Sequence, residues 1–298
     1  MRSGRSPALS TTPLIEAVNF HVWQPCNMRC AFCFGSFRDV RRDVLPDGHL
    51  VKQDAILVVA MLAEAGFQKI TFSGGEPLLC PWLPDLVQVA KRAQMTTAIV
   101  TNGSLLTEDL LSRMQGSLDW VALSIDSVNA HTLRATGRMT AGRPFSAHDY
   151  LARGDQVRNS GSRLKINTVV TSANWQEDLG SFVIALRPLR WKIMKVLPIE
   201  GQNSGSVERL QILDDQFDAF VARHEQVKRS GITLIPERND AMTESYAMVD
   251  PAGRFFDNSR GSYSYSKPIL SCGVPGALEQ VRISREKFLT RGGLYDWR

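Results

Sequence analysis

Two patterns of apolar residues alternate along the chain. Short runs rich in β-branched and aromatic residues predict strands, and longer stretches with apolar residues every three or four positions predict helices. The expected strands cover 17–23, 69–73, 97–101, 120–124, 164–170 and 191–197, and the expected helices cover 51–65, 83–94, 107–114, 147–159, 174–186 and 214–229. Strands that alternate with helices are typical of an α/β fold with a parallel sheet. Six such units predict a partial (βα)6 barrel of the TIM type.

The same pattern predicts how the chain is divided. Residues 1–16 are expected to form a flexible N-terminal segment, and residues 17–230 the partial barrel. Residues 231–298 carry Gly, Ser, Pro and Tyr clusters and are expected to add strands and loops, as a C-terminal extension that closes the functional site.

Composition narrows the class of protein. The chain has 298 residues, of which 43% are hydrophobic and 22% charged, which is typical of a globular protein and excludes disordered and fibrous classes. The net charge of +5 favours anionic partners. No apolar run reaches about 18 residues and the first twelve residues lack an apolar core, so we expect a cytoplasmic protein without membrane contact.

Three of the five cysteines lie close together, directly after the first expected strand. Cys26, Cys30 and Cys33 form a C-x3-C-x2-C loop, and loops at the carboxyl ends of barrel strands are where chemistry collects. Three thiolates can bind three corners of a [4Fe–4S] cluster and leave one iron open to a substrate or cofactor. The alternatives are unrelated buried thiols or a zinc site, which wants four ligands, although His21 and His49 do not complete a recognised spacing.

A second motif, Ser73-Gly74-Gly75-Glu76, ends the next expected strand. The two glycines permit close approach of the backbone to a small zwitterion, and Glu76 offers an acceptor for its ammonium group. Alone, this motif could be an ordinary turn after a strand. Beside the cysteine loop, it indicates a cofactor site.

Together these motifs resemble the radical S-adenosylmethionine superfamily. The resemblance implies that the open iron of the cluster binds the amino and carboxylate groups of S-adenosylmethionine, and that the Gly-Gly-Glu element holds the amino group. One-electron reduction then gives a 5′-deoxyadenosyl radical that abstracts hydrogen from a substrate. The resemblance adds four cofactor contacts, each of which could otherwise be an ordinary structural residue: Phe32, Asn102, Ser124 and Arg138.

Cations recur on one face of several expected strands. Lys69 shares a face with Ser73, while Lys165 pairs with Asn167 and Arg190 with Lys192 at the two-residue period of a strand. Cations in a parallel sheet covered by helices need a charged partner. Arg291, followed by two glycines, adds another anion-binding group. A triphosphate would satisfy all of them, although any single lysine could instead extend to water.

The resemblance narrows to the viperin family, because matching stretches cover most of the chain. R-W-K at 190–192 and F-L-T-R-G-G-L-Y at 288–295 are the most specific, and the others are 19–21, 33–34, 69–77, 100–104, 126–127, 165–167 and 199–201. It implies an enzyme that converts a ribonucleoside triphosphate to its 3′-deoxy-3′,4′-didehydro analogue, a chain terminator of RNA synthesis used in antiviral, here anti-phage, defence. The radical abstracts the 4′ hydrogen and the 3′ hydroxyl leaves as water.

The resemblance also gives roles to residues. Phosphates would bind Lys69, Lys165, Arg190, Lys192 and Arg291, with Asn167 near the sugar or base and Tyr246 helping to complete the reduction. An external electron donor is implied, and no direct nucleic acid binding is expected. The base stays open among CTP, UTP and GTP.

Two other functions remain open. One is a different radical enzyme that acts on a phosphorylated substrate, although many such members carry extra cysteine clusters and this chain has only Cys80 and Cys272 beyond the triad. The other is a non-catalytic iron–sulfur or nucleotide sensor, which would release no 5′-deoxyadenosine.

Overall fold

A computed structural model describes residues 15–297 of the chain. Most of the N-terminal segment 1–16, which we expected to be flexible, therefore lies outside the described residues.

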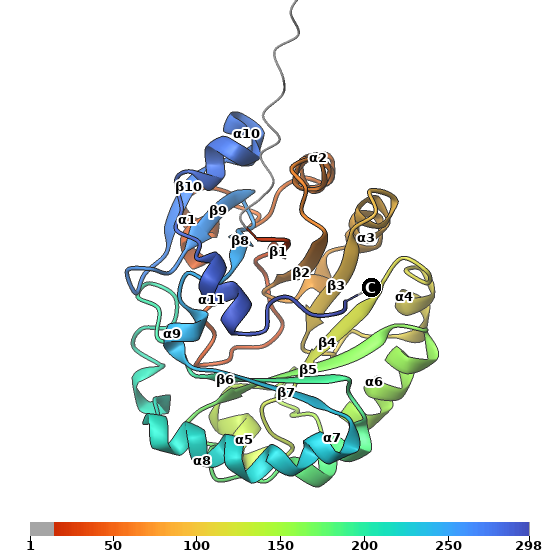
Figure 1. Cartoon of the computed structure of the whole chain (residues 1–298), viewed down its shortest axis with the longest axis vertical. Coiled ribbons are helices and arrows are strands. Elements are labelled where there is room, and N and C mark those ends of the chain that lie inside the picture. The colour runs from red at the N-terminus through yellow and green to blue at the C-terminus, as the bar shows by residue number, and fades with distance from the viewer. Residues whose placement is uncertain (1–14, 298) are drawn as a thin grey trace, which may run out of the picture.

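Strands and helices alternate through most of the described chain (Figure 1). The strands are β1 (Ala17–Trp23), β2 (Lys69–Gly74), β3 (Thr96–Thr101), β4 (Trp120–Ser124), β5 (Arg163–Val170), β6 (Arg190–Lys195), β7 (Thr233–Glu237), β8 (Ala247–Val249), β9 (Arg254–Asp257) and β10 (Ser264–Pro268). The α-helices are α1 (Arg38–Asp43), α2 (Lys52–Glu64), α3 (Leu83–Arg92), α4 (Glu108–Ser112), α5 (Ala130–Ala135), α6 (Ala147–Asn159), α7 (Gly180–Leu186), α8 (Asp214–His224), α9 (Asn239–Met242), α10 (Ile269–Leu278) and α11 (Arg285–Thr290). Short 3-10 helices are η1 (Pro77–Leu79), η2 (Glu208–Leu210) and η3 (Glu225–Ser230).

All ten strands belong to one sheet, in the order β10-β9-β8-β1-β2-β3-β4-β5-β6-β7. From β1 to β7 each strand pairs in parallel with the next, β8 pairs in parallel with β1, and β9 and β10 are antiparallel. The strands curve into an incomplete ring with helices outside it (Figure 1). The predicted partial barrel is confirmed. β7 and β8 extend it by two parallel strands, which lie in the C-terminal region where strands were expected without individual bounds.

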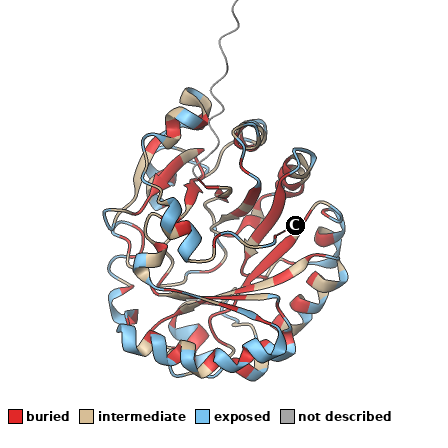
Figure 2. Cartoon of the chain, viewed as in Figure 1, coloured by how far each residue is buried: buried red, intermediate tan, exposed pale blue. Residues whose placement is uncertain are grey.

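The core lies between the ring of strands and the surrounding helices. In α3, Leu83, Leu86, Val87 and Ala90 are buried, and this helical spacing places them on one face, against the sheet. Figure 2 shows buried strands and exposed outer helix faces. Burying a large apolar side chain is worth about 1.5–3 kcal/mol, so these faces hold the helices onto the barrel.

The expected helix at 174–186 is shorter in the structure, where α7 begins at Gly180. Asn174 explains the difference. Its Oδ1 accepts a hydrogen bond from the backbone N–H of Thr171 at 2.7 Å, and its Nδ2 donates to the carbonyls of Asp126 at 2.7 Å and Val169 at 3.0 Å. These bonds form a turn that joins the ends of β4 and β5, and the segment before Gly180 is a set of turns instead of a continuous helix.

The C-terminal region contains helices as well as the expected strands and loops. The sequence did not predict α10, because Gly273, at φ 73°, and Pro275 interrupt the helical pattern of apolar residues there. After α11, residues 291–297, which we call the strap, cross the ring of strands towards β4 (Figure 1). There the carbonyl of Trp297 accepts a hydrogen bond from Nε1 of Trp120 at 2.9 Å.

Candidate functional site

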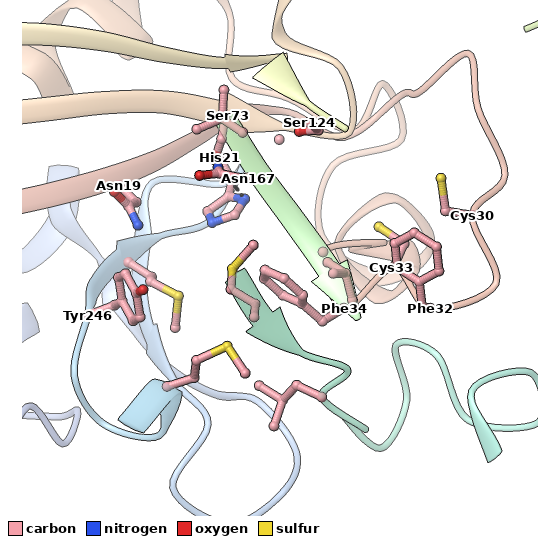
Figure 3. Close-up of a pocket in the computed structure, with 18 of the residues that line it drawn as sticks. Asn19, His21, Cys30, Phe32, Cys33, Phe34, Ser73, Ser124, Asn167 and Tyr246 are labelled. Atoms are coloured by element: carbon pink, nitrogen blue, oxygen red, sulfur yellow. Dashed lines mark hydrogen bonds between the residues drawn. The ribbon is translucent and has the colours of Figure 1, made fainter. Parts of the chain in front are cut away.

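One cavity of about 560 Å³ opens inside the barrel. Its wall contains nearly every residue that the sequence analysis selected, namely Cys26, Cys30, Phe32, Cys33, Lys69, Ser73, Gly74, Gly75, Asn102, Ser124, Arg138, Lys165, Asn167, Arg190, Lys192, Tyr246 and Arg291. Glu76 is the exception. Cys30, Cys33 and Phe32 lie at one end of the pocket, and Asn19 and Tyr246 lie at the other (Figure 3).

The cysteine loop (24–37) is held by backbone bonds from two sides. On one side the N–H groups of Gly75 and Glu76 donate to the carbonyls of Trp23 at 2.6 Å and Pro25 at 3.0 Å. On the other side the N–H of Ala31 donates to the carbonyl of Thr136 at 2.9 Å. The positions of the three thiols are therefore set by the β2 end and by the turn after α5.

Gly74 and Gly75 allow this close approach. A Cβ atom added to Gly74, whose φ is 149°, would lie 2.2 Å from the carbonyl oxygen of Trp23. A Cβ atom on Gly75 would lie 2.2 Å from the carbonyl oxygen of Gln24. Both glycines also line the cavity, so they pack against the cysteine loop and face the site.

The carboxylate of Glu76, which we predicted to accept the ammonium group of the cofactor, also has partners within the protein. Its side chain is buried, and its carboxylate accepts hydrogen bonds from Thr101 Oγ1 at 2.6 Å and from the N–H groups of Asn102 at 2.8 Å and Leu78 at 3.1 Å. It lies outside the cavity wall. In this structure Glu76 joins the Gly-Gly-Glu turn to the end of β3.

The three thiols suit an iron–sulfur cluster better than a single ion. Burial raises the pKa of the Cys33 thiol to about 12 and that of the Cys26 thiol to about 11, so without a metal these thiols keep their protons, and a bound cluster would displace them. Among residues 15–297, no three His, Cys, Asp or Glu side chains are arranged to hold one metal ion. A cubane binds each cysteine to a different iron, whereas zinc needs four ligands around one ion.

Arg138 connects the cysteine loop to β4. Its Nε lies 2.9 Å from Asp126 Oδ2, its Nη2 donates to the carbonyl of Ser124 at 2.5 Å, and its Nη1 contacts Cys30 Sγ at 3.6 Å. The guanidinium and the Asp126 carboxylate are both buried. Arg138 therefore places a positive charge beside a cluster cysteine, with Asp126 as its counter-ion.

Asn102 lies on the other side of the cysteine loop. Its Nδ2 donates to Oδ1 of Asn27 at 2.9 Å, within the loop itself. Phe32, between two of the cysteines, is buried with 5% exposure. The predicted cofactor residues thus surround the thiols.

Five cations line the cavity wall at its other end. Among the described residues, their ion pairs all go to Glu237, which lies 2.7 Å from Lys192 Nζ and 3.4 Å from Arg291 Nη1. Glu237 was not predicted from the sequence as a site residue. Its signal was the Thr233-Leu-Ile-Pro-Glu237 run, which reads as a short strand ending in a carboxylate.

The strap covers these cations with aromatic rings, and its Tyr295 and Trp297 were also missed as site residues. The guanidinium of Arg190 lies 3.7 Å from the ring centre of Tyr295, whose hydroxyl accepts a hydrogen bond from Lys69. The Lys69 ammonium lies 5.1 Å from the ring centre of Trp297. Cations over aromatic faces are held without being neutralised.

The cavity is therefore strongly electropositive. Burial, and then the nearby Lys192, Arg190 and Arg291, lower the pKa of Lys69 to about 7. Burial and the same kind of crowding lower the pKa of Lys165 well below its usual value, and burial lowers that of Lys192 to about 8. A bound polyanion would relieve this repulsion.

Three polar side chains lie between the cations and the cysteines. Asn167 Oδ1 is buried and has no hydrogen-bond partner among the described residues. Ser73 Oγ and His21 Nδ1 lie 3.2 Å apart, next to Asn167 in the pocket (Figure 3). Asn167 thus offers a free acceptor to a ligand in the cavity.

The chain is similar to known proteins along nearly its whole length. A family model described as the Radical SAM superfamily matches residues 22–171. An S-adenosylmethionine-dependent nucleotide dehydratase of Flammeovirga pacifica is 48% identical over 97% of this chain and 99% of that protein. The protein of the same name from Lacinutrix mariniflava is 48% identical over 98% of this chain, which spans 60% of that relative's length. S-adenosylmethionine-dependent nucleotide dehydratase RSAD2 of Danio rerio is 35% identical over 98% of this chain and 80% of that protein.

Solved structures share the fold at low sequence identity. Streptococcus suis SuiB bound to S-adenosylmethionine has a TM-score of 0.64 at 16% identity, over 82% of this chain and 60% of that chain. Native anSMEcpe with bound AdoMet has a TM-score of 0.65 at 13% identity, over 92% of this chain and 82% of that chain. At these identities the likeness concerns the fold alone.

Proposed function

The chain belongs to the radical SAM superfamily and to its S-adenosylmethionine-dependent nucleotide dehydratases, and from this premise we propose that it removes water from a ribonucleoside triphosphate. The product would be the 3′-deoxy-3′,4′-didehydro nucleotide, a terminator of RNA synthesis suited to antiviral defence. The predicted membership of the viperin family is confirmed by the RSAD2 relative. The observation that carries the proposal is the single cavity, which joins three cysteines to five cations.

The cysteine end of the cavity would hold the cofactors. Cys26, Cys30 and Cys33 would bind a [4Fe–4S] cluster. S-adenosylmethionine would lie among those predicted cofactor residues that line the cavity, which are Phe32, Ser73, Gly74, Gly75, Asn102, Ser124 and Arg138. When bound there and reduced by an external electron donor, the cluster and S-adenosylmethionine would supply a 5′-deoxyadenosyl radical. Glu76 would act through the turn that it stabilises.

The position of each residue along its strand orients the substrate. Lys69 begins β2 and Gly74 ends it, so at ~3.3 Å per residue roughly 16 Å separate them. Arg190, Lys192 and Lys165 likewise lie in the first half of β6 and β5. A triphosphate bound to these cations would direct its ribose towards the cysteines.

Asn167 and Tyr246 would contact the sugar and complete the reaction. Asn167 follows Lys165 by two positions on β5, towards the cysteine end, and would bind the ribose. Tyr246 lines the cavity beside Lys192, and we assign it to the final reduction step. The C-terminal extension, through its strap, would close the cavity against water.

The cellular location of the enzyme follows from its proposed substrate. Ribonucleoside triphosphates are cytoplasmic metabolites, so we place the reaction in the cytoplasm, without direct binding of nucleic acid. No helix among residues 15–297 has the length and apolarity needed to span a bilayer.

Anaerobic reconstitution with iron and sulfide tests this function. The enzyme would be given S-adenosylmethionine, dithionite and CTP, UTP or GTP separately, and the products analysed by mass spectrometry. We expect 5′-deoxyadenosine together with one triphosphate that has lost water. Release of 5′-deoxyadenosine while every triphosphate stays intact would indicate another substrate. Binding of a triphosphate with no 5′-deoxyadenosine would indicate a sensor.

A further inference from the structure

Glu237 ends β7 behind the cavity wall, with an exposed fraction of 0%. Both of its oxygens accept hydrogen bonds. Oε1 faces Lys192 Nζ at 2.7 Å and Arg291 Nη1 at 3.4 Å, and Oε2 accepts the hydroxyl proton of Tyr246. A buried carboxylate with this many donors is held in one orientation.

The three partners of Glu237 also hold one another. Lys192 Nζ donates to the Tyr246 hydroxyl at 2.6 Å, and the Tyr246 ring centre lies 3.6 Å from the Arg291 guanidinium. Arg291 is fixed further by the carbonyl of Ser245, which accepts from Nε at 3.1 Å and Nη2 at 2.9 Å. The four side chains therefore form one cluster, and three of them line the cavity.

Within residues 15–297, the other charged groups that act on Lys192 are positive. Arg190 lies on its own strand, Lys165 on β5, Lys69 on β2 and Arg291 at the start of the strap, and Glu237 is the carboxylate that faces them. Burial and crowding by cations both favour the neutral form of a lysine. Glu237 opposes both effects.

We propose that Glu237 is a positioning residue that keeps Lys192 charged and holds it, with Arg291 and Tyr246, at the cavity wall to receive the terminal phosphates of the substrate. The identity of the anion rests on the proposed function. The counter-ion role rests on the contacts of Glu237 alone.

The isosteric change Glu237→Gln separates charge from shape. The amide keeps the size of the side chain but lacks the negative charge. Its NH2 group must face either Lys192 and Arg291, which only donate, or the Tyr246 hydroxyl, which would then have to give up its present donor role. Lys192 would then lose its proton at a lower pH. Since one pKa unit is a tenfold change in protonation, we expect tripolyphosphate to bind up to ~10-fold more weakly at pH 8 and nearly normally at pH 6.5.

The test measures binding and titration on the reconstituted enzyme with S-adenosylmethionine. Calorimetry between pH 6.5 and 8.5 would give the affinities for inorganic tripolyphosphate and CTP. NMR of 13C-labelled lysines, with Lys192→Arg for assignment, would follow Lys192 itself. The matched control is Glu225→Gln, since Glu225 is half exposed, pairs with Lys228 and lies away from the cavity.

Two further variants keep the result decisive if Glu237→Gln folds poorly. Glu237→Asp retains the charge and should leave the Lys192 titration near that of the native enzyme. In a Lys192→Met background, Glu237→Gln should cost much less affinity than it does in the native enzyme, because the partner is already gone.

The outcomes are distinct. A lower titration midpoint of Lys192 together with a loss of affinity that grows with pH supports the proposal. An unchanged midpoint, or a loss of affinity equal at all pH values, overturns it. If the native enzyme binds neither tripolyphosphate nor any triphosphate while the midpoint still moves, the proposed function fails and the counter-ion role of Glu237 stands.

Discussion

At the scale of single residues, the cavity separates two kinds of charge. Arg138 is paired with Asp126 beside the cysteines, whereas Lys69, Lys165 and Arg190 form no ion pair within the described part of the chain. In a buried ion pair the attraction offsets much of the cost of removing both charges from water, whereas an unpaired buried cation keeps that cost until a ligand pairs with it. The phosphate end of the cavity is thus prepared for an anion at a cost to the free protein.

Removing one of these cations should weaken binding without affecting the cluster. We expect Lys192→Ala or Arg291→Ala to lower the affinity for the nucleoside triphosphate by about 1.5–3 kcal/mol, or roughly 10- to 150-fold, because each loses a charge-assisted hydrogen bond. Calorimetry measures the affinity and an iron assay measures the cluster. Undiminished affinity in both variants would contradict the assignment of the phosphate site.

The affinity for triphosphate should fall as the pH rises from 7 to 9. Lys69 and Lys192 have pKa values lowered to about 7 and about 8, first by burial. Bound phosphate favours the charged lysines, so binding is strongest below these values and weakens as the lysines lose their protons. The terminal phosphate is largely ionised above about pH 6, so it does not mask the trend. A flat profile measured by calorimetry across this range would rule out titrating lysines in the site.

At the scale of elements, the end of β2 determines where the cysteines lie. Gly74 and Gly75 pack directly on the backbone that leads into the cysteine loop, and Glu76 ties the same turn to β3. The Ser73–Glu76 motif, which the sequence indicates as a cofactor site, therefore also connects β2 and β3 to the cysteine loop.

Gly75→Ala should weaken the packing of the β2 end against the cysteine loop. The new Cβ would meet the carbonyl oxygens of Gln24 at 2.2 Å and Pro25 at 2.5 Å, and backbone atoms cannot give way cheaply. We expect a loss of about 1–3 kcal/mol of unfolding free energy and a lower iron content after reconstitution. Gly276→Ala is the control, since its nearest neighbour would be Cys272 Cβ at 3.6 Å. Equal melting temperatures and iron contents for the two variants would show that Gly75 does not support the cysteine loop.

At the scale of the whole molecule, the partial barrel separates its two functions along the strands. The cysteines follow the carboxyl end of β1, and four of the five cations occupy the first halves of β2, β5 and β6. One continuous sheet carries both groups, but different parts of its strands support the two ends of the cavity.

Oxidative removal of the cluster should therefore spare the phosphate end. We expect the cluster-free protein to form no 5′-deoxyadenosine and to bind inorganic tripolyphosphate within about threefold of the reconstituted enzyme, which is under ~0.7 kcal/mol. Activity and calorimetry on the same sample check this. A large loss of tripolyphosphate affinity would show that the two ends are coupled.

The sequence by itself determined the strands from β1 to β6, the cysteine loop and the cations, because period-two patterns and short motifs depend on neighbouring residues. It did not reveal Glu237, which meets Lys192 only through the pairing of β6 with β7. Nor did it reveal the aromatic cover, since Lys69 and Tyr295 are 226 positions apart. The sequence thus identified the charged residues. Tertiary structure decided which of them are neutralised and which stay free for a ligand. The physical reason is that Coulomb energy depends on distance in space and on burial, and neither can be read from positions along the sequence.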